Sequence, residues 1–205
     1  MTDFLKTNLE IYFIENPTAA EVFANQVLVN KRSRENAEKV RIVIFSNPCN
    51  PTSRIIRKDD IRKLINSVNS LVVLDEAYMD FAEDESLLGE FENYDNLIIL
   101  KTCSKALGSA ALRLGFAVAN KTLTNVIRAV KSPYNVNSVS QALGEVLFAH
   151  PDYIDNCIET VVNSRKELYN EILKIKSDKI EKVYETHTNF VFMKVKNAKQ
   201  VFEKM

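Results

Sequence analysis

Four short apolar runs constrain the fold of this chain more than any other feature. They are RIVIFS at 41–46, SLVVL at 70–74, NLIIL at 96–100 and GFAVA at 115–119. Runs of about five residues rich in β-branched side chains are typical of buried strands. A helical pattern at Lys58–Val68 separates the first two runs. The alternation predicts an α/β fold with a mostly parallel sheet covered on both faces.

The second half of the chain is predicted to be mainly helical. Beyond Pro133 we expect helices at Val139–His150 and Tyr153–Lys176, because apolar residues recur there at helical spacing. A strand at Asn189–Val195 and the start of another helix at Ala198–Met205 should follow.

We place a domain boundary inside the long second-half helix, near residue 160. Residues 1–160 then form a large domain, incomplete on its amino-terminal side, and residues 161–205 begin a small carboxyl-terminal α/β domain. Within the first segment, Glu21–Glu38 is compatible with a helix, but nothing before Val40 points to chemistry.

Composition excludes several classes of protein. Lys plus Arg and Asp plus Glu number 27 each, so the formal net charge is zero, and no basic stripe indicates a nucleic-acid partner. No apolar run approaches the ~20 residues of a membrane helix. The cysteines, Cys49, Cys103 and Cys157, are widely spaced and accompany only two histidines, so we expect no metal site. Their odd number, and a first segment unlike a secretion signal, favour the cytoplasm.

Polar clusters follow three of the predicted strands where each strand ends. They are NPCNPT at 47–52, DEAY at 75–78 and TCSK at 102–105, with Arg113 eight residues beyond the lysine. Taken singly, each has a structural explanation: an Asn-Pro turn, a helix cap or a solvated Ser-Lys pair. However, the carboxyl ends of parallel strands meet at one edge, where open α/β sheets bind their ligands. Together the clusters predict a binding site at that edge.

The stretch from Asn47 through Arg113 resembles the aminotransferase class I/II family, enzymes of fold type I that use pyridoxal 5′-phosphate (PLP). The resemblance covers about Val40 to Met205 and implies a PLP-transferase large domain. The branch most similar in pattern is that of the histidinol-phosphate aminotransferases, which share DEAY-x-x-F and SK-x-x-G-x-x-x-x-R-x-G. The matching segments are NPCNPT (47–52), DEAYMDF (75–81), SKALGSAALRLGFAVA (104–119), SPYNVNSVSQA (132–142) and THTNFVFMK (186–194).

The resemblance implies roles for four residues around the cofactor ring. Lys105 would be the catalytic residue, forming the Schiff base with PLP and then moving the α-proton between Cα and C4′. Asp75 would pair with the pyridine nitrogen and strengthen the ring as an electron sink. Asn50 and Tyr78 would hydrogen-bond the 3′ oxygen of the ring.

The resemblance also implies how the cofactor phosphate and the subunits are arranged. Thr102, Ser104 and Arg113 would hold the phosphate, for which a guanidinium fork and hydroxyl donors are suited. Enzymes of this family build their sites at a twofold interface, so a homodimer is expected.

The implied reaction is transfer of an amino group between histidinol phosphate and 2-oxoglutarate, in histidine biosynthesis. A PLP decarboxylase of the threonine-phosphate type shares most of these motifs and stays open as an alternative. A non-catalytic scaffold with the same fold also stays open, although intact Lys105 and Asp75 favour an enzyme. The PYNVNSVSQ stretch at 133–141 favours the transaminase.

The sequence departs from the family pattern in three places. The family continues NPxNPTG, whereas Ser53 and Arg54 follow Thr52 here, which should alter the turn and bring a charge close to the site. No glycine-rich phosphate turn precedes Asn47, and no late arginine for the substrate carboxylate follows. We therefore expect an incomplete aminotransferase, either a fragment of a longer protein or a naturally shortened relative.

Overall fold

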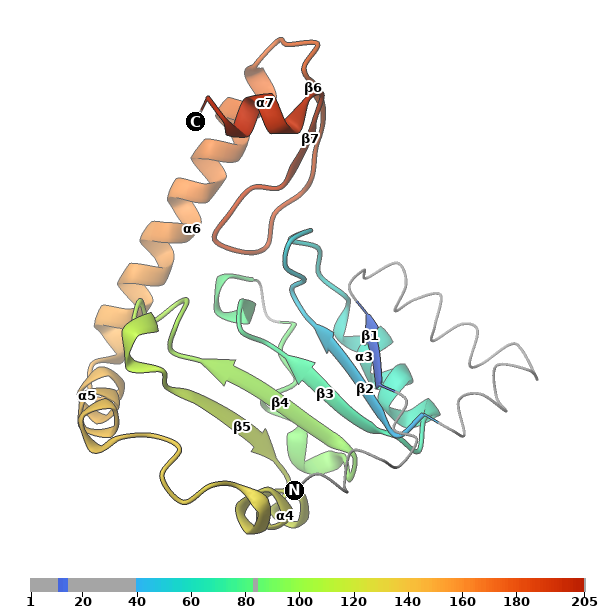
Figure 1. Ribbon diagram of the computed structural model, residues 1–205, viewed down its shortest axis with the longest axis vertical. Helices are drawn as coiled ribbons and strands as arrows, with labels where there is room; N and C mark the ends of the chain where they lie inside the picture. Colours follow the sequence, from blue (N-terminus) through green and yellow to red (C-terminus); the bar gives the residue numbers. More distant parts are fainter. Residues whose placement is uncertain (1–10, 15–39, 83–84, 205) are drawn as a thin grey trace.

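Five strands form the main sheet of the computed structural model, which describes residues 11–14, 40–82 and 85–204 (Figure 1). Strands β1 to β4 run parallel, and β5 runs antiparallel to β4. The predicted α/β class and mostly parallel sheet are confirmed, and the four predicted strands are observed to within two residues. In sheet order the strands are β1 (Ile11–Ile14), β2 (Ile42–Ser46), β3 (Leu71–Asp75), β4 (Leu97–Thr102) and β5 (Gly115–Ala119).

The register of β2, β3 and β4 brings their carboxyl ends to one edge. Ser46 lies opposite Asp75, and Asp75 lies opposite Leu100. The ladder continues one residue past the strands, because the N–H of Asn47 donates to the Asp75 carbonyl and the N–H of Glu76 to the Leu100 carbonyl, both at 2.9 Å. The polar residues that follow each strand therefore emerge side by side.

Helix α3 (Lys58–Ser67) and the strands bury a common apolar core. In β2 and β3 every second residue is buried, while the alternate residues are half-buried among the described segments. Asp59 and Asp60 lie in the first turn of α3, where carboxylates interact favourably with the helix dipole. The buried members of this core are Val40, Val43, Phe45, Ile56, Ile61, Leu64, Ile65, Val72, Leu74, Leu87, Leu97 and Ile99.

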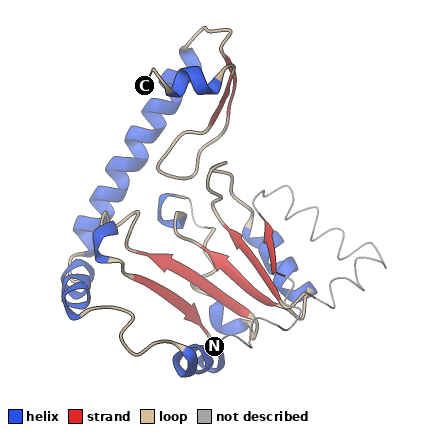
Figure 2. Cartoon of the chain, in the orientation of Figure 1, coloured by secondary structure: helices blue, strands red, loops and turns tan. Residues whose placement is uncertain are grey.

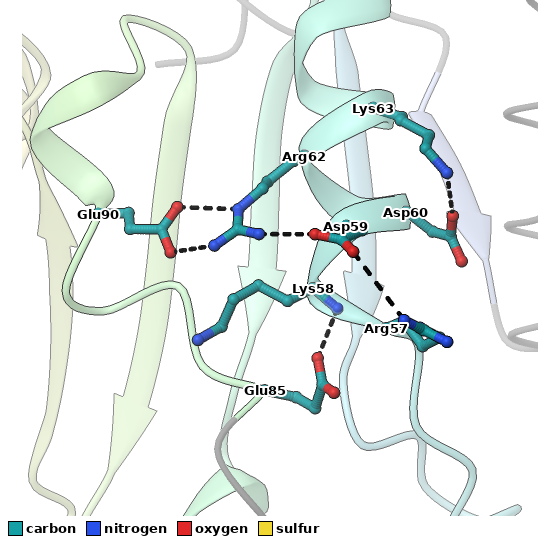
Figure 3. Close-up of polar contacts among 8 residues, drawn as sticks. All are labelled: Arg57, Lys58, Asp59, Asp60, Arg62, Lys63, Glu85 and Glu90. Atoms are coloured by element: carbon teal, nitrogen blue, oxygen red, sulfur yellow. Dashed lines mark hydrogen bonds and ion pairs between the residues drawn. The ribbon is translucent and has the colours of Figure 1, made fainter.

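Charged residues hold the start of α3 against the connection between β3 and β4 (Figure 3). Arg62 donates from Nε and Nη2 to the two carboxylate oxygens of Glu90, at 3.0 and 2.5 Å, and from Nη1 to Asp59 at 2.7 Å. The backbone N–H of Lys58 donates to Glu85 at 2.5 Å. The hydrogen bond from Arg62 holds the pKa of the Glu90 carboxyl below its usual value.

The predicted helices of the second half are observed as α5 (Ser138–Phe148) and α6 (Pro151–Lys174). Helix α4 (Lys121–Val130), which begins before Pro133, was not predicted. Its signal was Asn120, whose side chain accepts a hydrogen bond from the N–H of Leu123 at 2.9 Å and so caps the helix. The possible helix at Glu21–Glu38 lies outside the described residues.

Three short 3-10 turns complete the connections around the sheet. They are η2 (Met79–Phe81), η3 (Phe91–Asn93) and η4 (Ala110–Leu112). The turn η2 packs against α6, because Phe81 and Tyr78 share a second apolar cluster with Ile158 and Val162 of that helix. The long helix is thereby attached to the edge of the main sheet.

The carboxyl-terminal part forms a two-stranded antiparallel sheet of β6 (Ile180–Val183) and β7 (Met193–Val195), followed by α7 (Ala198–Phe202). The predicted strand at Asn189–Val195 was therefore wrong at its start, and β6 was not predicted. Residues 186–190 bend instead, because the Thr186 hydroxyl donates to the Phe190 carbonyl. Figures 1 and 2 show the connection between β6 and β7 reaching back toward the main sheet.

Candidate functional site

The loop that follows β2 is held in shape by its first asparagine. Asn47 is completely buried, and its amide donates to the Ile56 carbonyl at 3.1 Å and accepts from the Ile56 N–H at 2.7 Å. Backbone hydrogen bonds between Cys49 and residues 53–54 close the turn inside this loop. The loop thus presents Asn50 at the edge of the sheet in a defined position.

Asn50, Tyr78 and Lys105 are brought together from the ends of three neighbouring strands. The Asn50 amide donates to the Tyr78 hydroxyl oxygen at 3.0 Å. The amine of Lys105 lies 5.1 Å from the centroid of the Tyr78 ring. Tyr78 is 8% exposed, whereas Lys105 is exposed, so a fixed aromatic platform stands beside an accessible amine. Tyr78 and Lys105 follow Asn50 by 28 and 55 positions in the sequence, and the three residues form one cluster.

Asp75 and Glu76 are adjacent in sequence and have different surroundings. Asp75 is half-buried, and one of its oxygens accepts from the Ala77 N–H at 2.9 Å. Glu76 is completely buried and accepts from the Ser86 hydroxyl at 2.6 Å and from the Leu87 N–H at 3.0 Å. Burial raises the pKa of the Glu76 carboxyl, and these two hydrogen bonds partly oppose the rise. Asp75 is accessible to a ligand, whereas Glu76 anchors the neighbouring loop.

The three residues expected to hold a phosphate lie along the end of β4. The Thr102 hydroxyl accepts from the Ser104 N–H at 3.1 Å. Thr102 pairs with Gly115 of the antiparallel strand β5, and the N–H of Cys103 donates to the Leu114 carbonyl at 3.0 Å. The chain before β5 therefore brings Arg113 back to the end of β4. Gly115 permits this approach, because a Cβ there would lie 3.0 Å from the Lys101 carbonyl.

Arg113 itself is exposed at the surface of the edge. Its backbone is in the left-handed region at φ 51°, and its Nη1 donates to the Ala110 carbonyl at 3.0 Å. A guanidinium has five donors, so this local bond leaves capacity for a bidentate ligand. The structure gives Asp75 and Arg113 local partners, and brings neither into direct contact with Lys105 by a hydrogen bond or ion pair among the described residues.

Ser53 occupies the position where the family pattern has glycine. Its φ is 58°, the left-handed region that favours glycine, so the turn keeps a conformation that a glycine readily adopts. The expectation that this replacement alters the turn stays a prediction. Serine differs from glycine here by its hydroxyl, which is completely buried and contacts Thr186, His187 and Thr188.

Within the described ranges, no group of three or more His, Cys, Asp or Glu residues is placed to hold a metal ion. The search for a helix long and apolar enough to cross a membrane, made over the same ranges, found none.

Residues 21–205 match the aminotransferase class I and II family, over most of the chain. The chain belongs to this family. It is 50% identical to the histidinol-phosphate aminotransferase of Clostridium novyi (strain NT) over 170 residues, which are 83% of the chain and 47% of that relative. The chain spans about half the length of the curated relatives it matches.

Two solved structures show the shared fold. The histidinol-phosphate aminotransferase from Sinorhizobium meliloti in complex with PLP has a TM-score of 0.71 and 22% identity, over 83% of this chain and 46% of that one. The L-threonine-O-3-phosphate decarboxylase from Porphyromonas gingivalis has a TM-score of 0.69 and 20% identity, over 89% of this chain and 66% of that one. The expected fold-type-I architecture of this aminotransferase-family chain is therefore confirmed.

Two residues that support the site of this family member were missed by sequence reasoning. Glu76 stands in the DEAY motif, but nothing in the motif shows that its carboxylate is buried. Arg165 of α6 is buried and donates to the carbonyls of Phe81 and Thr188, at 3.1 and 2.8 Å. The sequence feature that could have identified Arg165 as buried is its place on the apolar face of a long helix, seven residues from both Ile158 and Ile172.

Glu76→Gln is expected to change the pH dependence of stability. The folded-state pKa of Glu76 lies above its ordinary value of 4.5, so ionisation costs stability as the pH rises through the folded pKa. An amide removes this cost. Urea unfolding at a series of pH values should therefore show the variant gaining stability relative to the unaltered chain as the pH rises above about 4.5.

Glu90→Gln is the matched control with the opposite sign. The folded-state pKa of Glu90 is lowered, so its contribution is present above the ordinary value and is lost as the pH falls through the folded pKa. The free energy of unfolding that Glu90→Gln loses relative to the unaltered chain should therefore vanish at low pH. A Glu76→Gln difference that stays constant with pH would contradict a destabilised carboxylate at position 76.

Proposed function

We propose that this chain carries the PLP-binding part of a histidinol-phosphate aminotransferase, which transfers an amino group between histidinol phosphate and 2-oxoglutarate. The observation that carries the proposal is the cluster of Asn50, Tyr78 and Lys105, with the amine 5.1 Å from the Tyr78 centroid. The name of a relative at 50% identity supports the same reaction. The decarboxylase alternative is supported by fold similarity at 20% identity, which says less about the reaction.

The residues at the edge fit PLP by the chemistry of their donors. An amine, a carboxylate, an amide and a phenol stand beside the ends of three strands, and a guanidinium and two hydroxyls follow β4. Among the described residues, the Thr52 hydroxyl oxygen is buried without a hydrogen-bond partner, which a bound ligand can satisfy. These groups match an aldehyde, a pyridine nitrogen, a phenolic oxygen and a phosphate.

Each side chain around the ring has a distinct task in the proposal. When bound, PLP supplies an electron sink for negative charge that develops at the substrate Cα. Lys105 carries the cofactor and moves the proton at the substrate Cα. Asp75 keeps the pyridine nitrogen protonated, since a carboxylate favours a neighbouring positive charge. Asn50 and Tyr78 donate to the ring oxygen, and their mutual hydrogen bond at 3.0 Å orients both.

Thr102, Ser104 and Arg113 hold the cofactor phosphate in this proposal. The hydroxyls supply neutral donors, and Arg113 supplies the charge-assisted donors that bind a phosphate most strongly. The return of the chain from β4 to β5 supports this grouping, because Thr102 pairs with Gly115, two residues after Arg113.

We further propose that residues 1–160 belong to a PLP-binding large domain and that residues 161–205 begin a small domain. The helix α6 passes residue 160 without interruption and would join the two. We propose a homodimer in the cytoplasm as the working form, with small-molecule substrates and neither nucleic acid nor membrane as a partner. The family pattern and the zero formal net charge support this assignment.

Lys105→Ala should abolish covalent attachment of the cofactor. The purified chain mixed with PLP is expected to show a visible absorption band, and borohydride should fix the cofactor on Lys105, as peptide mass spectrometry can locate. Lys131→Ala is the control, because Lys131 is exposed and, among the described residues, its amine donates to the Ser132 carbonyl alone. Borohydride adducts that persist in Lys105→Ala would remove the basis of the proposal.

Arg113→Ala should weaken PLP binding by at least about tenfold, since charge-assisted hydrogen bonds each contribute roughly 1.5–3 kcal/mol. Equilibrium titration followed by absorbance measures the effect. Pyridoxal, which lacks the phosphate, is the matched ligand and should bind both proteins about equally. If both ligands lose the same affinity, Arg113 has a structural role.

Histidinol phosphate and O-phosphothreonine distinguish the two enzyme hypotheses. The PLP-loaded chain is expected to convert 2-oxoglutarate to glutamate with histidinol phosphate, and to release no carbon dioxide from O-phosphothreonine. Turnover by this chain alone should be slow, because its sequence has no glycine-rich phosphate turn. Carbon dioxide release without glutamate formation would favour the decarboxylase.

A further inference from the structure

The hydroxyl of Ser53 makes an unusual number of contacts with one distant segment. It accepts hydrogen bonds from the N–H groups of His187 and Thr188, at 2.8 and 3.1 Å. It also lies 3.0 Å from the hydroxyl of Thr186 and 2.7 Å from that of Thr188. Because a serine hydroxyl has one proton and two acceptor sites, these contacts use its whole hydrogen-bonding capacity.

The direction of these bonds follows from the neighbouring donors. The Thr186 hydroxyl gives its own proton to the Phe190 carbonyl, so toward Ser53 it acts as an acceptor. The Ser53 proton therefore has a threonine oxygen to bind, whichever of Thr186 and Thr188 receives it. All the groups are buried or half-buried, so water competes weakly for them.

The same segment contacts the aromatic member of the site. The Phe190 ring meets the Tyr78 ring edge to face, with centroids 5.6 Å apart and an interplanar angle of 87°. On its other side the segment is held by Arg165, which donates to the Thr188 carbonyl and to Phe81. The segment thus contacts both the turn that carries Asn50 and Tyr78, to which Asn50 donates.

The left-handed backbone conformation of Ser53 is energetically unfavourable for a residue that carries a side chain. A non-glycine residue is less stable in this region than in its ordinary conformation, because its Cβ approaches the following carbonyl oxygen. A glycine would avoid that cost and would also lack the hydroxyl. The hydrogen bonds offset the cost, which indicates that the hydroxyl has a use at this position.

We propose that Ser53 is a positioning residue that couples segment 186–190 to the Asn50–Tyr78 pair. Through this hydroxyl, the carboxyl-terminal segment holds Phe190 against the Tyr78 ring and so fixes the phenol that faces the ligand. The coupling itself is a property of this chain, and its effect on the cofactor rests on the proposed function.

The test compares Ser53→Ala and Ser53→Gly with the control Ser67→Ala in the ligand-free chain. Alanine removes the hydroxyl but keeps a side chain at a left-handed backbone position. Glycine removes the hydroxyl and also adopts this conformation without strain, so the glycine variant should fold even where the alanine variant does not. The Ser67 hydroxyl donates to the Leu64 carbonyl within α3 at 2.8 Å, and among the described residues no hydrogen bond joins its side chain to segment 186–190. Two signals are measured: amide hydrogen exchange at His187 and Thr188, and the fluorine NMR signal of Tyr78 in fluorotyrosine-labelled protein.

Both Ser53 variants should accelerate exchange at Thr188, whose N–H donates to the Ser53 hydroxyl, by about tenfold or more, the loss expected for a buried hydrogen bond. Exchange at His187 should change less, because its N–H also donates to the Ser53 backbone carbonyl at 3.3 Å, which both variants keep. The Tyr78 fluorine signal, assigned with Tyr78→Phe, should move toward that of free fluorotyrosine as the Phe190 ring withdraws. Ser67→Ala should change neither signal. Unchanged exchange, or faster exchange with an unmoved Tyr78 signal, overturns the coupling.

A second measurement, made with PLP bound, distinguishes failure of this inference from failure of the proposed function. With PLP bound, the midpoint pH of the visible absorption change should shift in both Ser53 variants and stay constant in Ser67→Ala, because in the proposed function Tyr78 would donate to the ring oxygen. A chain that binds no PLP refutes the proposed function, while the ligand-free signals still decide the coupling. Bound PLP with an unshifted midpoint refutes the positioning role.

Discussion

The parallel register of β2, β3 and β4 is the constraint on which the rest of this structure depends. Ser46, Asp75 and Leu100 lie in one row across the three strands. Side chains that follow in the sequence must leave the sheet at the same edge, since parallel strands end in the same direction. A shift of one residue in any pair would turn each buried side chain to the other face and scatter the polar cluster.

Buried polar groups convert this shared edge into a defined site. Asn47 closes its loop through Ile56, and Glu76 holds the backbone at Leu87. Each such group is desolvated on folding and is tolerated only because its hydrogen bonds are made. The net gain from each bond is modest, about 1 kcal/mol, but an unmade bond costs more. These groups therefore select one loop conformation more than they add stability.

Contacts of long sequence separation connect the carboxyl-terminal segment to this edge. Ser53 meets residues 133 to 135 positions later, and Arg165 bridges η2 and Thr188. The small sheet of β6 and β7 lies at the far end of α6, yet its connecting loop returns toward the main sheet (Figure 1). This arrangement brings Phe190 of the carboxyl-terminal part against the Tyr78 ring.

Local patterns in the sequence were sufficient for much of the fold. Apolar runs of five or six residues predicted β2 to β5, because β-branched side chains are typical of strands. The expectation of a buried strand was wrong for β5, most of which is exposed among the described residues. The motifs around Asn50, Asp75 and Lys105 indicated a PLP site because they resemble those of the aminotransferase class I/II family. Helix α4 was missed although Asn120 caps it, and the start of the Asn189–Val195 strand was wrong.

What only the tertiary structure decided was the set of partners made across the fold. Segment 186–190 contacts Ser53 and Tyr78, neither of which lies near it in sequence. The raised pKa of Glu76 likewise depends on burial, which local sequence does not show. The sequence by itself determined which groups stand at the edge, since strand patterns and residue types are local. Their neighbours and electrostatics are set by packing between distant segments, which no local pattern records.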